Sequence, residues 1–453
     1  MTRDEAQTEL CWQEKREARF QRWLSAPGVK FINAEAEQSY KARVNRIVDA
    51  IRLREPDRVP CFLPAGTFPA FYGGINIYKA MSDGEAMKQA WRKFLRDFDN
   101  DVLVPPIPTS ARADALLQNK ARKSPGNGLP ENASMSQYVE GEYMKADEYD
   151  ALIEDPSDFF LRTYLPRVMG AFQGFDRLIP FRYAFGLPGI FLEPAALPEV
   201  QAAFQKIVDY GKEMMKAAAA SAQIISEGQA MGFPLEWGGG AHAPFDLLGD
   251  TLRGTRGILT DMHRRPDKLH EAMEVCVAWI VESALRRANL SGRPLIFMAL
   301  HKGDDAHMSG KQFETFYWPY LKRVILGLVN EGCVPLLFAE GIYNSRLEVI
   351  KDLPKASVIW WFDRTDMAAA KHILGDTACL AGNVPTSLMC TGTPTQVKEC
   401  CRQLIEICGK GGGYILTGGA QVHYTPCVAD NLHAMMEVAK EFGVYKRAVA
   451  RSS

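Results

Sequence analysis

The sequence predicts an α/β protein, a (β/α)8 TIM barrel with an N-terminal helical extension. The chain has 453 residues and is 47% hydrophobic, which is enough for one large core. Short apolar runs that end in a polar residue or a glycine recur along it, and in its second half they alternate with helical patterns. A nucleotide-binding open sheet would need a glycine-rich turn after a strand, and the sequence has no GxGxxG or GxxxxGK[ST] pattern in that context.

The predicted domains are a helical extension over residues 1–56 and a barrel over residues 57–445. The extension is highly charged, and apolar residues such as Phe20 and Trp23 recur in it at helical spacing. The barrel carries a polar, turn-rich insertion at about residues 109–150. Loops of this length inside a compact domain are usually functional or mobile, so we expect the insertion near a substrate mouth.

Apolar runs between turn signals give the elements of the first half. A helical pattern covers residues 85–98, and a long Ala- and Met-rich helix is predicted over residues 198–226. The sequence PLEW reads as a strand that ends at a run of three glycines. Strands are therefore predicted over residues 58–63, 101–104, 179–185 and 234–237.

The second half is more regular. Asp366 and Thr393 are predicted N-caps, and Pro394 fits the first position of a helix. Helices are predicted from residue 266 onward and over residues 313–329, 366–375, 393–409 and 427–442. Strands are predicted over residues 294–300, 334–339, 357–362, 378–381 and 414–416. Without residues 179–185 there are eight strand candidates, which is the number of strands in a (β/α)8 barrel.

Ionisable side chains follow several of these strands directly. Active sites of such barrels lie at the carboxyl ends of the strands. We therefore expect His301, Asp304, Glu340 and Asp363 to be catalytic, as acids, bases or metal ligands. The competing interpretation is structural: a hydrogen-bonded loop for His301 and Asp304, and a salt bridge for Glu340.

Other polar and aromatic residues near strand ends are candidates for binding substrate. Because strand side chains alternate, one of the two tryptophans at 360 and 361 must face into the barrel, where it could stack on a flat substrate or simply fill the core. Arg182 could anchor a carboxylate or a phosphate, with a surface salt bridge as the alternative. The predicted substrate-binding residues are Arg182, Trp237, His242, Trp361, Asn383 and His423.

Several motifs together resemble the uroporphyrinogen decarboxylase (URO-D) superfamily. They are EPDRVP, APFDLLGDTLRG, LLFAEG, IWWFDRTDMAAAKHILGD, LAGNVPTSLMCTGTPTQVKECC and GGGYILTGGA, which follow one another over roughly residues 45–443. The resemblance implies a distorted (β/α)8 barrel, and it suggests a homodimer. The resemblance also implies one of two activities, decarboxylation or corrinoid-linked methyl transfer, and particular residues help to distinguish them.

The decarboxylase branch carries arginines after the first strand, where they bind the acidic side chains of the tetrapyrrole. The equivalent stretch here runs from Leu63 to Phe68 and contains no arginine. Burying a substrate with many carboxylates requires clustered cations. Uroporphyrinogen is therefore not the expected substrate.

The chain resembles the corrinoid-linked methyltransferase branch more closely, at DRVP and at the GTP-x-x-V helix. That branch binds zinc through a His-x-Cys pair and a later Cys, and the equivalent positions here are Phe338, Glu340 and Ala420. No zinc site is expected, because one carboxylate does not make one. The sequence around Asp261 and His263 is predicted to be helical, so it is not a corrinoid-binding motif, and cobalamin would have to come on a separate corrinoid protein.

The expected function is methyl transfer between a small organic substrate and a corrinoid protein. The alternatives are a decarboxylase acting on a smaller carboxylic acid, with Arg182 or Lys302 holding the carboxylate, and a non-catalytic barrel that binds a ligand. A net charge of −1 gives no field to attract nucleic acid or an anionic membrane. Without a signal-type or membrane-spanning apolar run, the chain is expected to be cytoplasmic.

Overall fold

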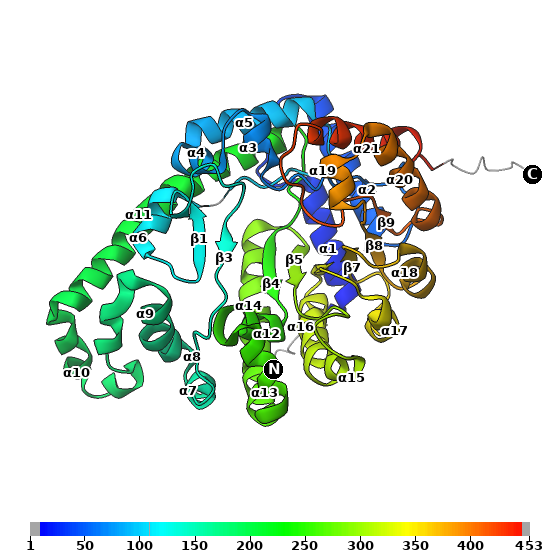
Figure 1. Ribbon diagram of the computed structural model, residues 1–453. Coiled ribbons are helices and arrows are strands. Elements are labelled where there is room, and N and C mark those ends of the chain that lie inside the picture. The colour runs from blue at the N-terminus through cyan, green and yellow to red at the C-terminus, as the bar shows by residue number, and fades with distance from the viewer. Residues whose placement is uncertain (1–9, 108, 446–453) are drawn as a thin grey trace, which may run out of the picture.

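The computed structural model describes residues 10–107 and 109–445, and a parallel sheet lies at its centre (Figure 1). Its strands are neighbours in the order in which they occur along the chain, and every neighbouring pair is parallel. Parallel neighbours in sequence order require a crossover after each strand, which the intervening helices provide. The strands are β4 (Gly239–His242), β5 (Leu295–Leu300), β6 (Val334–Ala339), β7 (Ile359–Phe362), β8 (Cys379–Ala381) and β9 (Tyr414–Ile415).

Two short extended segments continue this sheet between β9 and β4. Cys61 forms a parallel bridge with Leu416, and its carbonyl accepts a 3.2 Å hydrogen bond from the backbone N–H of Asp101. Leu103 forms a parallel bridge with Leu235. The segments therefore occupy the places predicted for the first two barrel strands, although only single bridges hold them. The predicted α/β fold with a parallel sheet is confirmed.

Helices cover the outside of the sheet. Trp360 packs outward among them, whereas Trp361 belongs to the inner cluster with Leu336 and Ile415, as strand alternation requires. These helices are α12 (Pro244–Leu248), α13 (Gly254–Arg264), α14 (Pro266–Ser291), α15 (Gly310–Gln312), α16 (Trp318–Asn330), α17 (Leu347–Ile350), α18 (Met367–Leu374), α19 (Thr386–Thr391), α20 (Pro394–Cys408) and α21 (Val428–Glu441). Among the helices of the described ranges, none has the length and apolar character needed to cross a bilayer.

Two N-terminal helices, α1 (Trp12–Ser25) and α2 (Ala34–Ile51), pack against the sheet beside the starts of its strands. Val44 and Ile47 of α2 share a buried cluster with Leu295 and Val334, the first residues of β5 and β6. This contact fills the end of the barrel opposite the carboxyl ends of the strands. Any site must therefore open at the other end.

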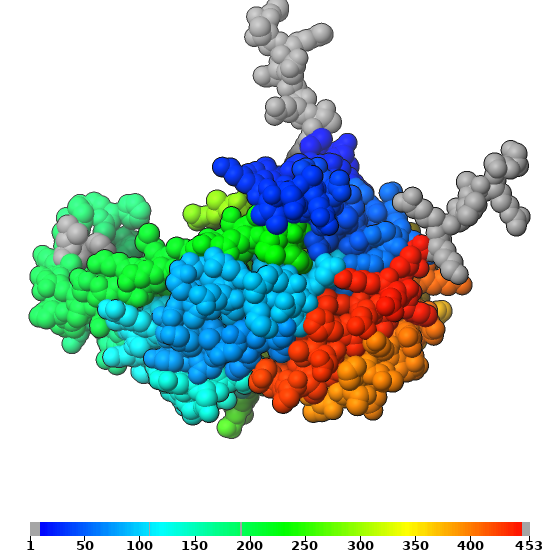
Figure 2. Space-filling view, turned by 90° about the horizontal axis from the view of Figure 1, so that it is seen from above, coloured from blue at the N-terminus to red at the C-terminus, as the bar shows by residue number. Residues whose placement is uncertain are grey.

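Ion pairs also fix this end of the molecule. The Asp101 carboxylate is fully buried, and it accepts hydrogen bonds from Arg46 at 2.6 Å, from Arg58 at 2.8 Å and from the backbone N–H of Cys61 at 2.7 Å. On the neighbouring face α21 lies against the segment after α5 (Gly84–Asp97), shown in Figure 2 as red against light blue. The rings of Phe98 and His433 stack there with their centroids 4.2 Å apart.

The remaining elements form a lobe beside the barrel (Figure 1). The long helix α11 runs along its outer side, and a small sheet with strand order β2-β1-β3 lies between α11 and the barrel. These elements are α3 (Phe68–Tyr72), α4 (Ile77–Ser82), α5 (Gly84–Asp97), α6 (Ala111–Leu117), β1 (Arg122–Pro125), β2 (Gly128–Leu129), β3 (Gln137–Tyr138), α7 (Tyr149–Glu154), α8 (Pro156–Asp158), α9 (Leu165–Val168), α10 (Pro188–Leu192) and α11 (Pro198–Ala230).

Two predicted strands are wrong. Residues 179–185 contain a 3-10 turn over Phe181–Ala184 instead, with exposed apolar side chains and no sheet beside them. The third barrel strand, predicted over residues 234–237, is β4, which begins two residues after the predicted end and includes the last two of the three glycines. A Cβ on Gly238 would lie 2.5 Å from Ser291 Oγ, so glycine allows α14 to pack close to this strand.

Candidate functional site

An aromatic layer lies inside the barrel. The Trp237 and Phe297 rings stack with centroids 4.9 Å apart, and Phe338 lies 4.8 Å from Trp361. The Phe297 and Phe338 centroids are 6.4 Å apart, so the rings form a continuous group from β4 to β7. Residues two positions further along a strand point to the same face. The layer therefore underlies the inward-facing residues at the strand ends.

Those residues include His301, Glu340 and Asp363. His301 lies four positions after Phe297, Glu340 two after Phe338, and Asp363 two after Trp361. The His301 Nε2 and the Glu340 Oε2 are 3.7 Å apart. The backbone N–H of Gly341 donates a 3.1 Å hydrogen bond to Asp363, which links the ends of β6 and β7.

His301 is half-exposed and forms a pair with Asp250. Its Nδ1 lies 2.6 Å from Asp250 Oδ2, and Lys302 Nζ lies 2.7 Å from the other carboxylate oxygen. The hydrogen bond that His301 donates to Asp250 raises the pKa of His301 to about 9. Conversely, hydrogen bonds from His301 and Lys302 outweigh burial and lower the pKa of Asp250. At neutral pH His301 is therefore an imidazolium ion held by an ionised carboxylate.

A buried acid in α12 positions this pair. Asp246 is 1% exposed, and it accepts hydrogen bonds from the backbone N–H groups of His301 at 2.9 Å and Lys302 at 3.0 Å. The hydroxyl of Tyr317 donates a further bond at 2.6 Å. Burial raises the pKa of Asp246 to about 6, and these donors are what keep its charged form available. Asp246 thus fixes the turn after β5.

His242, at the end of β4, completes this end of the sheet. Desolvation by neighbouring protein atoms lowers its pKa, and the charge of His301 acts in the same direction. The two histidines therefore differ at neutral pH, with His301 charged and His242 neutral. A neutral imidazole and an imidazolium beside carboxylates can accept and donate protons, respectively.

Four other predicted residues are not in this group. Asp304 is buried and accepts hydrogen bonds from the backbone and the ring of His307, so it holds a turn. Asn383 donates a 2.8 Å hydrogen bond to the carbonyl of Thr365. His423 is exposed in the loop after β9.

Arg182 lies in the lobe, on the 3-10 turn that replaces the predicted strand. It is exposed, and its guanidinium lies 3.6 Å from Glu154, which matches the surface salt bridge considered from the sequence. The turn carries it away from the strand ends, where a substrate anchor was expected.

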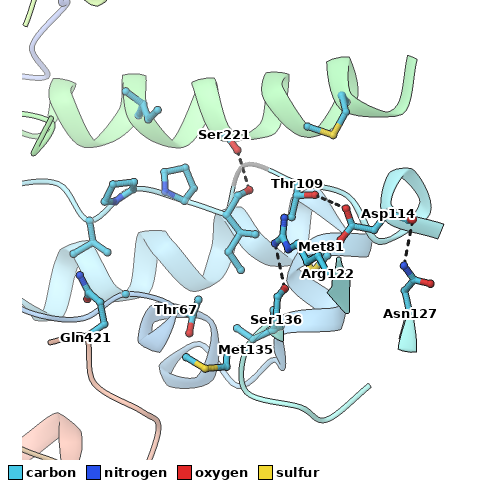
Figure 3. A pocket seen from close by; sticks show the side chains of 18 of the residues that line it. Thr67, Met81, Thr109, Asp114, Arg122, Asn127, Met135, Ser136, Ser221 and Gln421 are labelled. Carbon is cyan, nitrogen blue, oxygen red and sulfur yellow. Dashed lines mark hydrogen bonds between the residues drawn. The ribbon is translucent and has the colours of Figure 1, made fainter. Parts of the chain in front are cut away.

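A cavity of about 850 Å³ opens beside the aromatic layer. Trp237 and Leu63 line it from the barrel. The helix α11 closes one side, and the insertion at about residues 109–150 closes another. Figure 3 shows Asp114, Arg122 and Asn127 together at one end and Gln421 at the other. The insertion thus lines this cavity, and a substrate mouth beside it stays a prediction.

One acid in this lining is unusual. Glu236 is 6% exposed and forms no hydrogen bond or ion pair with any residue that the structure describes. Burial alone raises its pKa to about 8. The sequence places Glu236 beside the glycine run, but nothing in the sequence shows that its carboxyl group is enclosed and has no partner.

Asp246 and Asp250 also have a role here that the sequence does not single out. Both lie in APFDLLGDTLRG, one of the motifs that carry the family resemblance, and this could have identified them. The helix α12 and the π-helical turn Gly249–Arg253 after it place Asp246 and Asp250 beside the end of β5.

A zinc site of the kind found in the methyltransferase branch does not fit these residues. Phe338 is part of the aromatic layer, Glu340 lies near His301, and the third position is Ala420. In the described ranges, no group of three or more His, Cys, Asp or Glu side chains is arranged to hold a metal ion. No step is therefore assigned to zinc.

Comparisons with known proteins agree with this fold. The model of the family described as "Uroporphyrinogen decarboxylase (URO-D)" matches residues 191–442. A uroporphyrinogen decarboxylase of Hamiltonella defensa is 32% identical over 121 residues, which are 26% of this chain and 33% of that protein. The match thus spans about a third of the length of this curated relative.

One solved structure gives the same result for the fold. A methyltransferase from Methanosarcina mazei superposes with a TM-score of 0.56 at 15% identity, covering 88% of this chain and 98% of that one. A B12-independent methionine synthase from Shewanella sp. W3-18-1 gives a TM-score of 0.33 at 12% identity, covering 45% and 62% of the two chains.

Proposed function

The chain belongs to the uroporphyrinogen decarboxylase family, and we propose that it transfers a methyl group between a small organic substrate and a corrinoid protein. The proposal includes a cytoplasmic location. It goes beyond the family itself, whose members include both decarboxylases and methyltransferases. The lining of the cavity is the observation on which it rests.

This lining is mostly apolar. Among its described residues Arg122 is the one cation, whereas Asp114 and Glu236 are acids, and Met81, Met169 and other apolar side chains make up most of the rest. A substrate with several carboxylates would lose its hydration here without enough positive charge to replace it. A small and largely apolar molecule fits better, and it can also place its methyl group against the sulfur and ring atoms of the wall.

The polar group at the strand ends supplies proton chemistry for such a reaction. When a methyl group leaves a heteroatom, that atom needs a proton, and in the reverse direction it must lose one. His301 carries such a proton. Asp250 forms hydrogen bonds with both His301 and Lys302, and Glu340 lies near the second ring nitrogen of His301. A reduced corrinoid supplies the methyl acceptor when its carrier protein docks at the barrel mouth.

The experiment is a search for corrinoid-dependent turnover by the purified chain. We would mix the protein with cob(I)alamin, or with methylcobalamin for the reverse direction, and follow the visible spectrum with neutral ethers, thioethers, amines and phenols. Conversion that requires the protein and falls in His301→Gln supports the proposal. Its refutation would be a corrinoid spectrum unchanged with every substrate class.

The alternative reaction is measured in the same samples. The release of CO2 from monocarboxylic acids of similar size would be followed without corrinoid. Decarboxylation without methyl transfer would replace the proposed function, with Arg122 as the cation in the cavity that could hold a carboxylate.

A further inference from the structure

Glu236 is an acid whose surroundings contain nothing to stabilise its charge. Its side chain is more than nine-tenths buried, and it lies in the cavity lining beside Trp237, with Leu235 on its other side. The described part of the chain provides it with no hydrogen-bond donor and no cation within ion-pair distance. Buried polar groups are rarely left without partners, and such a group is commonly explained by a catalytic role or by a missing ligand.

The other titratable groups of this cavity lie on different elements. Asp114 belongs to α6, Arg122 to β1 and Tyr210 to α11. Arg122 donates a hydrogen bond to Ser136 at 3.2 Å, and Asp114 accepts one from Thr109 at 3.2 Å, as the dashed lines in Figure 3 show. None of them forms an ion pair with Glu236.

The protonation of Glu236 follows from this isolation. An isolated carboxylate in an apolar wall loses its hydration without compensation, so the neutral acid is favoured. Burial accordingly raises the pKa of Glu236 to about 8. At neutral pH its carboxyl group therefore keeps its proton and has an O–H donor to offer to a molecule in the cavity.

We propose that Glu236 is the group that touches the substrate, as a neutral carboxylic acid that donates a hydrogen bond and then a proton to an uncharged heteroatom. This inference rests on the proposed function for the reaction, but its binding part stands on the cavity alone. It assigns the cavity to neutral, largely apolar molecules with an ether-type acceptor atom. His301 lies outside the cavity lining, so this inference assigns the proton that the substrate receives to Glu236 in place of His301.

The step balances in atoms and electrons. The bond between the substrate heteroatom and its methyl carbon breaks, and its electron pair stays on the heteroatom. The proton of Glu236 moves to that atom, so the product leaves as an alcohol, phenol or thiol. The methyl group goes to a reduced corrinoid as co-reactant, which contributes the electron pair of the new bond. The Glu236 carboxylate then regains a proton from water.

The charge of the cavity agrees with an uncharged substrate. With Glu236 neutral, the remaining charged lining residues are Asp114 and Arg122, which carry opposite signs and lie at the end of the cavity opposite Gln421 (Figure 3). A cationic amine would instead favour an ionised Glu236. The two possibilities make opposite predictions for Glu236→Gln, because the amide still donates a hydrogen bond but carries neither a negative charge nor a transferable proton.

Infrared difference spectroscopy tests the protonation state without any turnover. The wild-type protein at pH 7 should show a carboxylic-acid C=O band that is missing in Glu236→Gln and that disappears in the wild type as the pH rises past 8. Glu348→Gln is the matched control, because Glu348 is exposed on α17 and pairs only with Lys351. If the Glu236→Gln difference spectrum shows a carboxylate band at pH 7, the inference is overturned.

Binding tests the substrate class. Benzyl methyl ether and N-methylbenzylamine have the same shape, but only the amine is cationic at pH 7. We expect the ether to bind more tightly in calorimetry, and to bind Glu236→Gln with an affinity within about threefold of the wild type. If the amine binds more tightly than the ether and this preference is lost in Glu236→Gln, Glu236 is a carboxylate and the assignment is refuted. The assignment is also refuted if the ether does not bind.

Turnover then separates this inference from the proposed function. With any methyl donor that the wild type accepts, Glu236→Gln should lower kcat by about 10²- to 10⁴-fold with KM nearly unchanged. A fully active Glu236→Gln variant would exclude Glu236 as the proton donor. If no methyl transfer occurs at all while the acid band and the ether preference are found, the proposed function fails and the neutral-acid site remains.

Discussion

Replacing Asp250 by Asn should move the pKa of His301 by a measurable amount. In the wild type the hydrogen bond that Asp250 accepts from His301 raises this pKa to about 9, compared with 6.5 for an unperturbed histidine. The amide removes the negative charge but keeps the size of the side chain. We expect the pKa of His301 to fall toward its ordinary value in Asp250→Asn, with Glu340 at 3.7 Å retaining part of the increase.

The energetic size of this pair follows from the same values. A pKa difference of this kind would correspond to about 3 kcal/mol in a fully enclosed pair. The side chain of His301 is 43% exposed, however, and solvent screening lowers the expected contribution to about 1 kcal/mol. Because the folded pKa is raised, this stabilisation is complete below about pH 6.5 and disappears as the pH rises through about 9.

The assay is NMR of the protein labelled at the histidine rings. The chain has eight histidines, and His301→Gln identifies the signal of His301 by its loss. Asp352→Asn is the control, because Asp352 pairs with Lys322 at an exposed site away from the strand ends. A His301 that titrates near 6.5 in the wild type, or whose pKa is the same in Asp250→Asn, would refute this account of the pair.

Three further perturbations test other parts of the structure. Asp101→Asn should destabilise the protein by about 3 kcal/mol in urea denaturation, because it removes the fully buried negative charge that pairs with both Arg46 and Arg58, while Arg46 keeps its pair with Asp57; a change below about 1 kcal/mol would contradict this. Gly341→Ala should cost about 1–3 kcal/mol in the same assay, since φ is +88° and the new Cβ would lie 2.4 Å from Asp304 Oδ2; wild-type stability would show that the turn differs. Glu340→Gln should lower the rate of methyl transfer about fivefold, because the exposed pair of Glu340 with His301 contributes about 1 kcal/mol; an unchanged rate would show that Glu340 has no part in the reaction.

The sequence was informative wherever local patterns decide the structure. The predicted strand before His301 is β5, the run before Glu340 is β6, and the caps at Asp366 and Thr393 both form. Apolar runs of this kind are strands in a buried parallel sheet because both of their faces are covered. The motifs also identified the family, since they combine residues from several strand ends in a fixed order.

The residues that gather around His301 could be predicted only in part. Their places at the carboxyl ends of two predicted strands grouped His301 with Glu340, and the structure brings them to 3.7 Å. Asp304 follows the same strand but is turned away, because its carboxylate is used by the N–H of His307. A loop can direct a side chain either way, and its own hydrogen bonds decide the direction.

The sequence by itself determined the fold class and the order of the strands, because both depend on residue types at known spacings. The tertiary structure decided which acids share a site. Asp250 reaches His301 only through the turn after α12, and Glu236 lies without a partner only because segments far apart in the chain enclose it. Desolvation depends on everything that surrounds a group, so its effect on a pKa is fixed only when the chain is folded.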